Sequence, residues 1–75
     1  MAAVSVGAST AVHLDVSPYR GTVFNNGTTT IWWGPSSSVT TSNGIPILPG
    51  GSWDKFPYSP WVISDSGTND VRTDV

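Results

Sequence analysis

The chain has 75 residues, of which 37% are hydrophobic and 11% charged, with no cysteine and a formal net charge of −2. A chain of this length makes one domain, and the missing cysteines exclude disulfides and thiolate metal sites. The basic residues Arg20, Lys55 and Arg72 are far apart in the sequence, so we expect neither nucleic-acid binding nor attachment to an anionic membrane.

Residues 1–9 are expected to form a flexible arm, because little in their sequence fixes them before they meet a neighbouring protein. The opening stretch has no positively charged n-region and no long apolar core, so it is a poor signal peptide. No apolar run in the chain approaches the roughly 20 residues of a membrane span. Residues 10–75 are then the single folded domain.

From residue 10 onward the sequence predicts strands, because Glu and Gln are absent and no apolar stripe at helical spacing lasts three turns. Apolar residues alternate with others in residues 10–16, 21–25, 28–34 and 71–75. We expect an all-β domain, a small antiparallel β-sandwich or barrel of roughly six to seven short strands. The residues predicted to form its core are Val12, Leu14, Val16, Val23, Ile31, Trp33, Ile47, Trp61, Ile63 and Val71, and Thr73 and Val75 are also expected to face inward.

Glycine, proline and asparagine mark the turns between these strands. The turn glycines are Gly27 in "NNG", Gly44 in "SNG", Gly50 in "LPGG" and Gly67 in "DSGT". Asn-Gly between two strand-like runs predicts a hairpin, and "LPGG" has the Pro and Gly positions of a type II turn. Pro46 donates no N–H to a ladder, so residues 45–48 are predicted to be an edge strand or a bulge.

The aromatic residues are the main candidates for contacts with other proteins. Strand alternation directs Trp32 away from the core that Trp33 enters, and outward tryptophans are typical of protein interfaces. The stretch "FPYSPW" is interpreted either as a proline-protected edge or as a projecting loop that presents aromatic rings. The interface candidates are Trp32, Trp53, Phe56, Tyr58 and Tyr19. An alternative use of Trp32 is stacking against a sugar ring.

Catalytic and metal-binding chemistry is not predicted. His13 and Asp15 alternate with core residues on one strand, and no serine has the context of a nucleophile elbow. A single histidine without other soft ligands does not make a zinc site. Asp65, Asn69 and Asp70 lack the dense oxygen spacing of calcium loops. We therefore expect no enzyme activity, no cofactor, no metal and no small-molecule substrate.

The stretch from Tyr19 to Val75 resembles the small β-domains of structural proteins in tailed-bacteriophage virions. The motifs that carry this resemblance are "NNG", "TIWWG", "VTTSNGIPILPG" and "SGTNDVR". The sequence departs from the pattern in "IWW" and in "DKFPYSP", and both departures enlarge the aromatic surface.

This resemblance implies a virion structural protein, and a free-standing chain of this size looks most like a capsid decoration or stabilisation protein. Such a protein is made in the host cytoplasm and binds the major capsid protein on the outer surface of the shell, often as a trimer or another symmetric cluster. A small domain without a covalent staple agrees with this, because such domains commonly depend on association. The alternatives are a tail, head–tail connector or fibre component and, from another class, a surface glycan-binding module.

Overall fold

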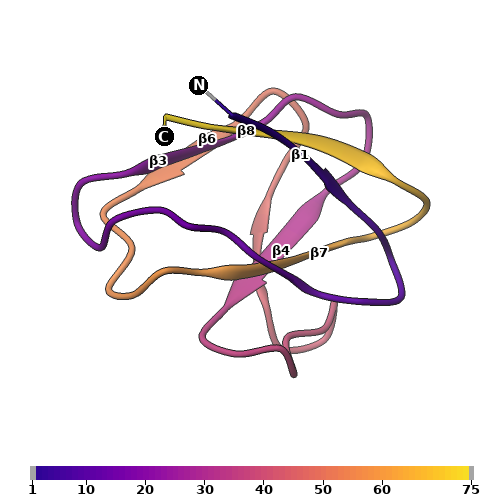
Figure 1. The fold of residues 1–75 in the computed structure, drawn as a ribbon. Coiled ribbons are helices and arrows are strands. Elements are labelled where there is room, and N and C mark those ends of the chain that lie inside the picture. Colours follow the sequence, from indigo (N-terminus) through magenta and orange to yellow (C-terminus); the bar gives the residue numbers. More distant parts are fainter. Residues whose placement is uncertain (1, 75) are drawn as a thin grey trace.

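A computed structural model describes residues 2–74, which form eight β-strands and no helix, and hence no helix able to cross a bilayer. The strands are β1 (Ala2–Val6), β2 (Val12–His13), β3 (Thr22–Asn25), β4 (Ile31–Gly34), β5 (Ile45–Ile47), β6 (Ser52–Asp54), β7 (Trp61–Ser64) and β8 (Asn69–Thr73). They form two four-stranded sheets, β1-β8-β3-β6 and β2-β7-β4-β5, that enclose the core between them (Figure 1). The all-β, sandwich-like prediction is confirmed, with eight strands in place of six to seven.

The strand pairing is nested, so that the first half of the chain pairs with the second half. β1 pairs with β8, β2 with β7, β3 with β6 and β4 with β5, all antiparallel. The four nested pairs together form one long hairpin. Because this hairpin is rolled up, β3 also lies beside β8 and β4 beside β7. This connectivity is that of an eight-stranded jelly roll, an architecture of viral capsid proteins, lectins and cupins. Because one topology serves such different proteins, it does not by itself select a function.

The N-terminal segment is a strand, which corrects the prediction of a flexible arm. β1 pairs with β8 along all five of its residues, and the two strands run side by side at the top of Figure 1. Val6 is completely buried in the core. The radius of gyration of the Cα atoms is 10.5 Å, close to the value of about 11 Å for a compact chain of this length. Met1 and Val75, which the sequence assigned to the arm and to an inward position, lie outside the described residues.

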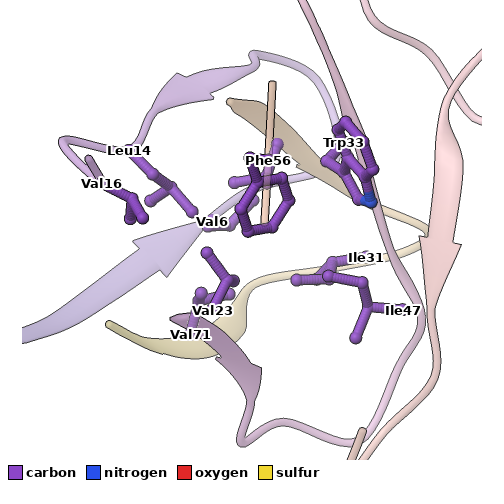
Figure 2. Packing of buried hydrophobic residues seen from close by; sticks show 10 residues of the cluster. Val6, Leu14, Val16, Val23, Ile31, Trp33, Ile47, Phe56 and Val71 are labelled. Atoms are coloured by element: carbon purple, nitrogen blue, oxygen red, sulfur yellow. The ribbon is translucent and has the colours of Figure 1, made fainter. Parts of the chain in front are cut away.

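The core lies between the two sheets and contains most of the residues predicted for it. Phe56 lies beside Trp33 at its centre (Figure 2), and their ring centroids are 4.7 Å apart. Val12 is half-buried and packs against the edge of this core. The predicted residues that are buried in it are Leu14, Val16, Val23, Ile31, Trp33, Ile47 and Val71, and Val6, Phe56 and Val62 join them without having been predicted.

Trp61 and Ile63 lie on the outer face of the second sheet. Trp61 is only half-buried there, which corrects its assignment to the core, whereas Ile63 is buried, as predicted. Val62, between them, takes the inward position opposite Trp33. Trp61 is half-buried and its ring stacks on that of His13, with centroids 4.9 Å apart. Ile63 is buried but does not belong to the core cluster. The run "WVI" looked continuously apolar, yet neighbouring side chains of a strand face opposite sides.

Most of the predicted turns are present. Gly51 N–H donates to the carbonyl of Leu48 at 2.8 Å and Gly50 has φ 81°, as a type II turn requires. Gly67 has φ 62° in the turn between β7 and β8. Gly44 ends the loop of the β4–β5 hairpin, and β5 is the edge strand that Pro46 predicted.

The hairpin predicted at residues 25–27 is wrong, because β3 and β4 belong to different sheets and the loop between them crosses from one sheet to the other. Asn25 and Asn69, both buried, hold this crossing. Asn69 Nδ2 donates to Asn25 Oδ1 at 2.7 Å. Asn25 Nδ2 also donates to the carbonyls of Thr29 and Ile47, and Asn69 Oδ1 accepts from the N–H groups of Thr28 and Thr29.

The two asparagine side chains therefore form a buried polar network in which every amide hydrogen has an acceptor. Networks of this kind, when fully satisfied, make a small core rigid. The network ties β3, β5, β8 and the crossing loop together without a disulfide. Disulfides and metal ions are therefore not the only internal cross-links available to a domain of this size.

Candidate interaction surface

Several of the interface candidates gather around one buried ring. Trp33 packs against Trp53 with ring centroids 5.5 Å apart and against Tyr58 at 5.8 Å, in addition to its edge-to-face contact with Phe56. We call these four residues the aromatic cluster. Tyr19 joins it through the backbone, because its N–H donates to the carbonyl of Phe56 at 2.8 Å.

Strand positions explain why Trp53 is the exposed member of the aromatic cluster. Trp53 lies opposite Val23 in the β3–β6 ladder, and Val23 is completely buried, so Trp53 also faces the space between the sheets. β6 is an edge strand, however, and has a neighbour on only one side. The Trp53 side therefore stays open, and this residue is 39% exposed.

Phe56 is completely buried, which corrects its assignment to an interface. Lys55, the residue before it, has φ 59° and turns the chain toward the core directly after β6. Pro60 is also fully buried, and the Ser59 hydroxyl donates to the carbonyl of Val16 at 2.8 Å. Tyr58 is half-buried against the core. The segment "FPYSPW" is therefore packed against the sandwich and does not project as a loop.

Trp32 faces away from the core, as predicted, but its own hairpin loop covers part of it. Val39, in that loop, is buried and touches the places where Gly34 and Gly44 would carry side chains. A Cβ at Gly44 would lie 2.8 Å from the Cβ of Trp32. Trp32 is half-buried, and its Nε1 is buried without a hydrogen-bond partner among residues 2–74. The indole is thus not the open platform that sugar stacking needs.

Within residues 2–74, three of the four large apolar residues that remain exposed lie on or beside the edge strands β5 and β6. Ile45 on β5 is 41% exposed, Leu48 in the turn after β5 is 65% exposed, and Trp53 lies on β6. We call these three residues the β5–β6 edge. Tyr19 is 67% exposed and lies next to the segment that follows β6. Single exposed apolar residues are normal, whereas neighbouring ones mark an interaction surface.

Ile45 and Leu48 are exposed residues that were not among the predicted interface candidates. Because of Pro46, residues 45–48 were predicted to be an edge strand or a bulge, but only Ile47 among their aliphatic residues was assigned, to the core. A signal was present in Pro46, because a proline-protected edge strand has no further strand to cover its open side. Ile45 faces the interior opposite Trp33, yet it stays exposed for this reason.

Asp54 and Lys55 are the charged residues next to Trp53 at the β5–β6 edge, and both are exposed. Arg72 Nη2 and Asp70 Oδ2 form an ion pair at 3.0 Å on the outer face of the first sheet. Hydrogen bonds from Arg72 and then from Asn26 hold the pKa of Asp70 below its ordinary value of 3.8. Within residues 2–74 no pocket and no group of three or more metal-ligating side chains is found.

No protein-family model, no curated protein and no solved structure matches this chain.

Proposed function

We propose that the chain is a structural protein of a bacteriophage virion that binds the outer surface of the major capsid protein shell and stabilises it. The observation that carries the proposal is the exposure of Ile45, Leu48 and Trp53 on and beside the edge strands β5 and β6 of a small, weakly charged sandwich. The sequence resemblance to β-domains of virion proteins suggests the assembly to which such an edge would bind, namely a capsid. The jelly-roll connectivity is compatible with this setting.

Contact at the β5–β6 edge would be made by side chains. Pro46 has no N–H to offer, so β5 is a poor template for an added strand. Covering an exposed aliphatic or aromatic side chain fully contributes about 1.5–3 kcal/mol. Three partly exposed side chains supply only modest affinity for a single binding site. A symmetric cluster of chains that attaches at several capsid contacts at once binds much more tightly.

Backbone strain next to this edge supports the same surface. Tyr19 has φ 62° and Lys55 has φ 59°, the only non-glycine residues between residues 2 and 74 with positive φ. Left-handed backbone at such residues costs of order 1–3 kcal/mol and tends to occur at functional sites. Both residues flank Phe56, one through a hydrogen bond and one through the chain. The hydrogen bond from the Tyr19 N–H to the Phe56 carbonyl ties the backbone of this exposed residue to the aromatic cluster.

Quantitative mass spectrometry and electron microscopy of particles from the phage that encodes the chain test this proposal. Decoration of the shell predicts on the order of hundreds of copies per particle, spread over the outer surface. About a dozen copies or fewer at one vertex would instead support the tail, connector or fibre alternative. Absence from the particle would overturn all virion roles.

The glycan-binding alternative is tested separately with the purified chain. Titration with simple sugars, followed by tryptophan fluorescence, is expected to give no change in the spectrum. A saturable change that disappears in Trp53→Ala but persists in Trp32→Ala would favour a glycan site at the β5–β6 edge over attachment to the capsid.

A further inference from the structure

The four edge strands of the sandwich differ in how they are protected against pairing with another chain. β5 contains Pro46, β6 ends at Asp54, and β2 is only two residues long. Proline, charge and short length are the devices that natural sheets use at their edges. β1 is five residues long and has neither proline nor a charged side chain. It is the one unprotected edge within residues 2–74.

The apolar interior is also incompletely covered beside β1. Val4 on β1 and Val12 on β2 are half-buried and pack against the core from this side. The two strands pair with β8 and β7, and β1 contacts β7 as well, so both valines lie at the same edge of the sandwich. A neighbour placed along β1 would bury more of both side chains.

We propose that a second copy of the chain adds to this edge, β1 against β1 and antiparallel, about a twofold axis at Val4. This pairing places Ala2 opposite Val6 of the other copy, Ala3 opposite Ser5, and Val4 opposite its own equivalent. No charged side chain of either β1 faces another one. The alternating backbone N–H and C=O groups that β1 directs away from β8 become paired. The two first sheets then form one continuous sheet, and the contact is isologous.

The choice of a second copy rests on this self-complementarity. A partner strand with charged residues would meet only small neutral side chains, whereas β1 itself meets a matching set of Ala, Ser and Val. The β5–β6 edge stays free in such a dimer because β6 and β1 lie at opposite ends of the first sheet. The inference does not depend on the capsid role, and the dimer would present two such edges.

Charge pairs at Ala3 and Ser5 test the register, because both residues are exposed. Within one chain they lie opposite Arg72 and Asp70. The variant Ala3→Glu/Ser5→Lys places opposite charges across the dimer contact and also beside these partners. The variant Ala3→Lys/Ser5→Lys places like charges across the contact. Cross-strand charge pairs predict a dissociation constant about tenfold higher for the second variant than for the first.

Sedimentation equilibrium of the wild type and both variants measures this difference, with circular dichroism to verify folding. Hydrogen exchange gives a second readout, because the amides that β1 directs outward should become protected as concentration rises. A wild type that stays monomeric at about 1 mM overturns the proposal. Equal dimerisation of the two variants also overturns it, as does a dimer that only Leu48→Ser disrupts.

Discussion

Gly27 lies so close to Asn69 that a side chain at residue 27 would overlap the Asn69 amide oxygen. That oxygen accepts from the N–H groups of Thr28 and Thr29, so the glycine leaves room for the network that fixes the crossing loop. The φ of Gly27 is not in the left-handed region, unlike those of Gly50 and Gly67. Residue 27 is therefore glycine because the Asn69 side chain lies so close to its backbone, and not because the turn needs a left-handed residue.

Gly27→Ala should therefore lower the free energy of unfolding by about 2–4 kcal/mol, because the new methyl group displaces a buried amide. Asn69→Ala should cost about 2–3 kcal/mol, because two loop N–H groups lose their acceptor. The double variant should cost clearly less than the sum, with a coupling energy of about 1–2 kcal/mol. Urea unfolding of the four proteins measures this cycle. Strict additivity would mean that the two residues do not interact.

Trp33→Ala should destabilise the domain by about 3–5 kcal/mol, because it empties the centre of the aromatic cluster. Trp32→Ala should cost about 1–2 kcal/mol, since that side chain is only half-buried under its hairpin loop. The two neighbours provide matched controls for each other. Chemical denaturation with unchanged slope checks the ranking, and equal losses would contradict the assignment of their faces.

Lys55→Gly should raise the free energy of unfolding by up to about 1 kcal/mol. Relief of the left-handed backbone at φ 59° outweighs the added flexibility of glycine in the unfolded chain. Asp54→Gly is the matched control, because residue 54 lies in β6 and glycine there should destabilise by about 0.5–1 kcal/mol. If both substitutions destabilise equally, the strain assigned to residue 55 is absent.

Stability should depend on the ionisation of Asp70. The pKa of this carboxyl is lowered in the folded chain, chiefly by its hydrogen bond with Arg72 and then by that with Asn26. Its contribution is therefore fully present above pH 3.8, the ordinary value, and is lost as the pH falls through the folded pKa.

Asp70→Asn and Arg72→Gln should each flatten the acid limb of the stability curve below pH 3.8. Because this ion pair is exposed, added salt should weaken the effect. Thermal melts at a series of pH values, at low and high salt, measure both changes. An acid limb that is identical in the wild type and in both variants would contradict the proposed contribution.

Side-chain alternation was sufficient to predict the inward faces of the strands. Leu14, Val23, Ile31 and Trp33 were placed in the core from period-two spacing alone, and they are buried there. The type II turn was predictable because Pro49 and Gly50 have steep local preferences. These features depend only on residues adjacent in the sequence.

Features that depend on distant residues were not predictable. "NNG" has the local signature of a hairpin, but Asn25 reaches Asn69 and Ile47, and the chain crosses between sheets there. Trp61, and not Val62, was predicted to face the core. This was wrong because a continuous apolar run on a strand does not show which of its side chains point inward. β1 was not predicted because its small residues give a weak strand signal, and because β8, with which it pairs, lies at the other end of the described residues 2–74.

The same limit applies to the candidate surface. Aromatic content predicted that some rings would be exposed, but only the sheet order makes β5 and β6 the open edge. Phe56 and Trp53 are three residues apart in similar surroundings, yet one is fully buried and the other is exposed. The burial of these two side chains differs because Lys55, between them, has a left-handed backbone conformation that turns the chain. Residue preferences do not favour this conformation for lysine, so the sequence did not predict it.

The proposed attachment of the β5–β6 edge to a capsid is tested most directly by binding the purified chain to particles from which it has been removed. Leu48→Ser is the informative variant, because residue 48 is 65% exposed and its loss should leave the melting temperature unchanged. Ser37→Ala, in the exposed hairpin loop, is the control. The account predicts saturable binding that Leu48→Ser weakens by about tenfold and Ser37→Ala does not change. Equal binding of the wild type and both variants would contradict it.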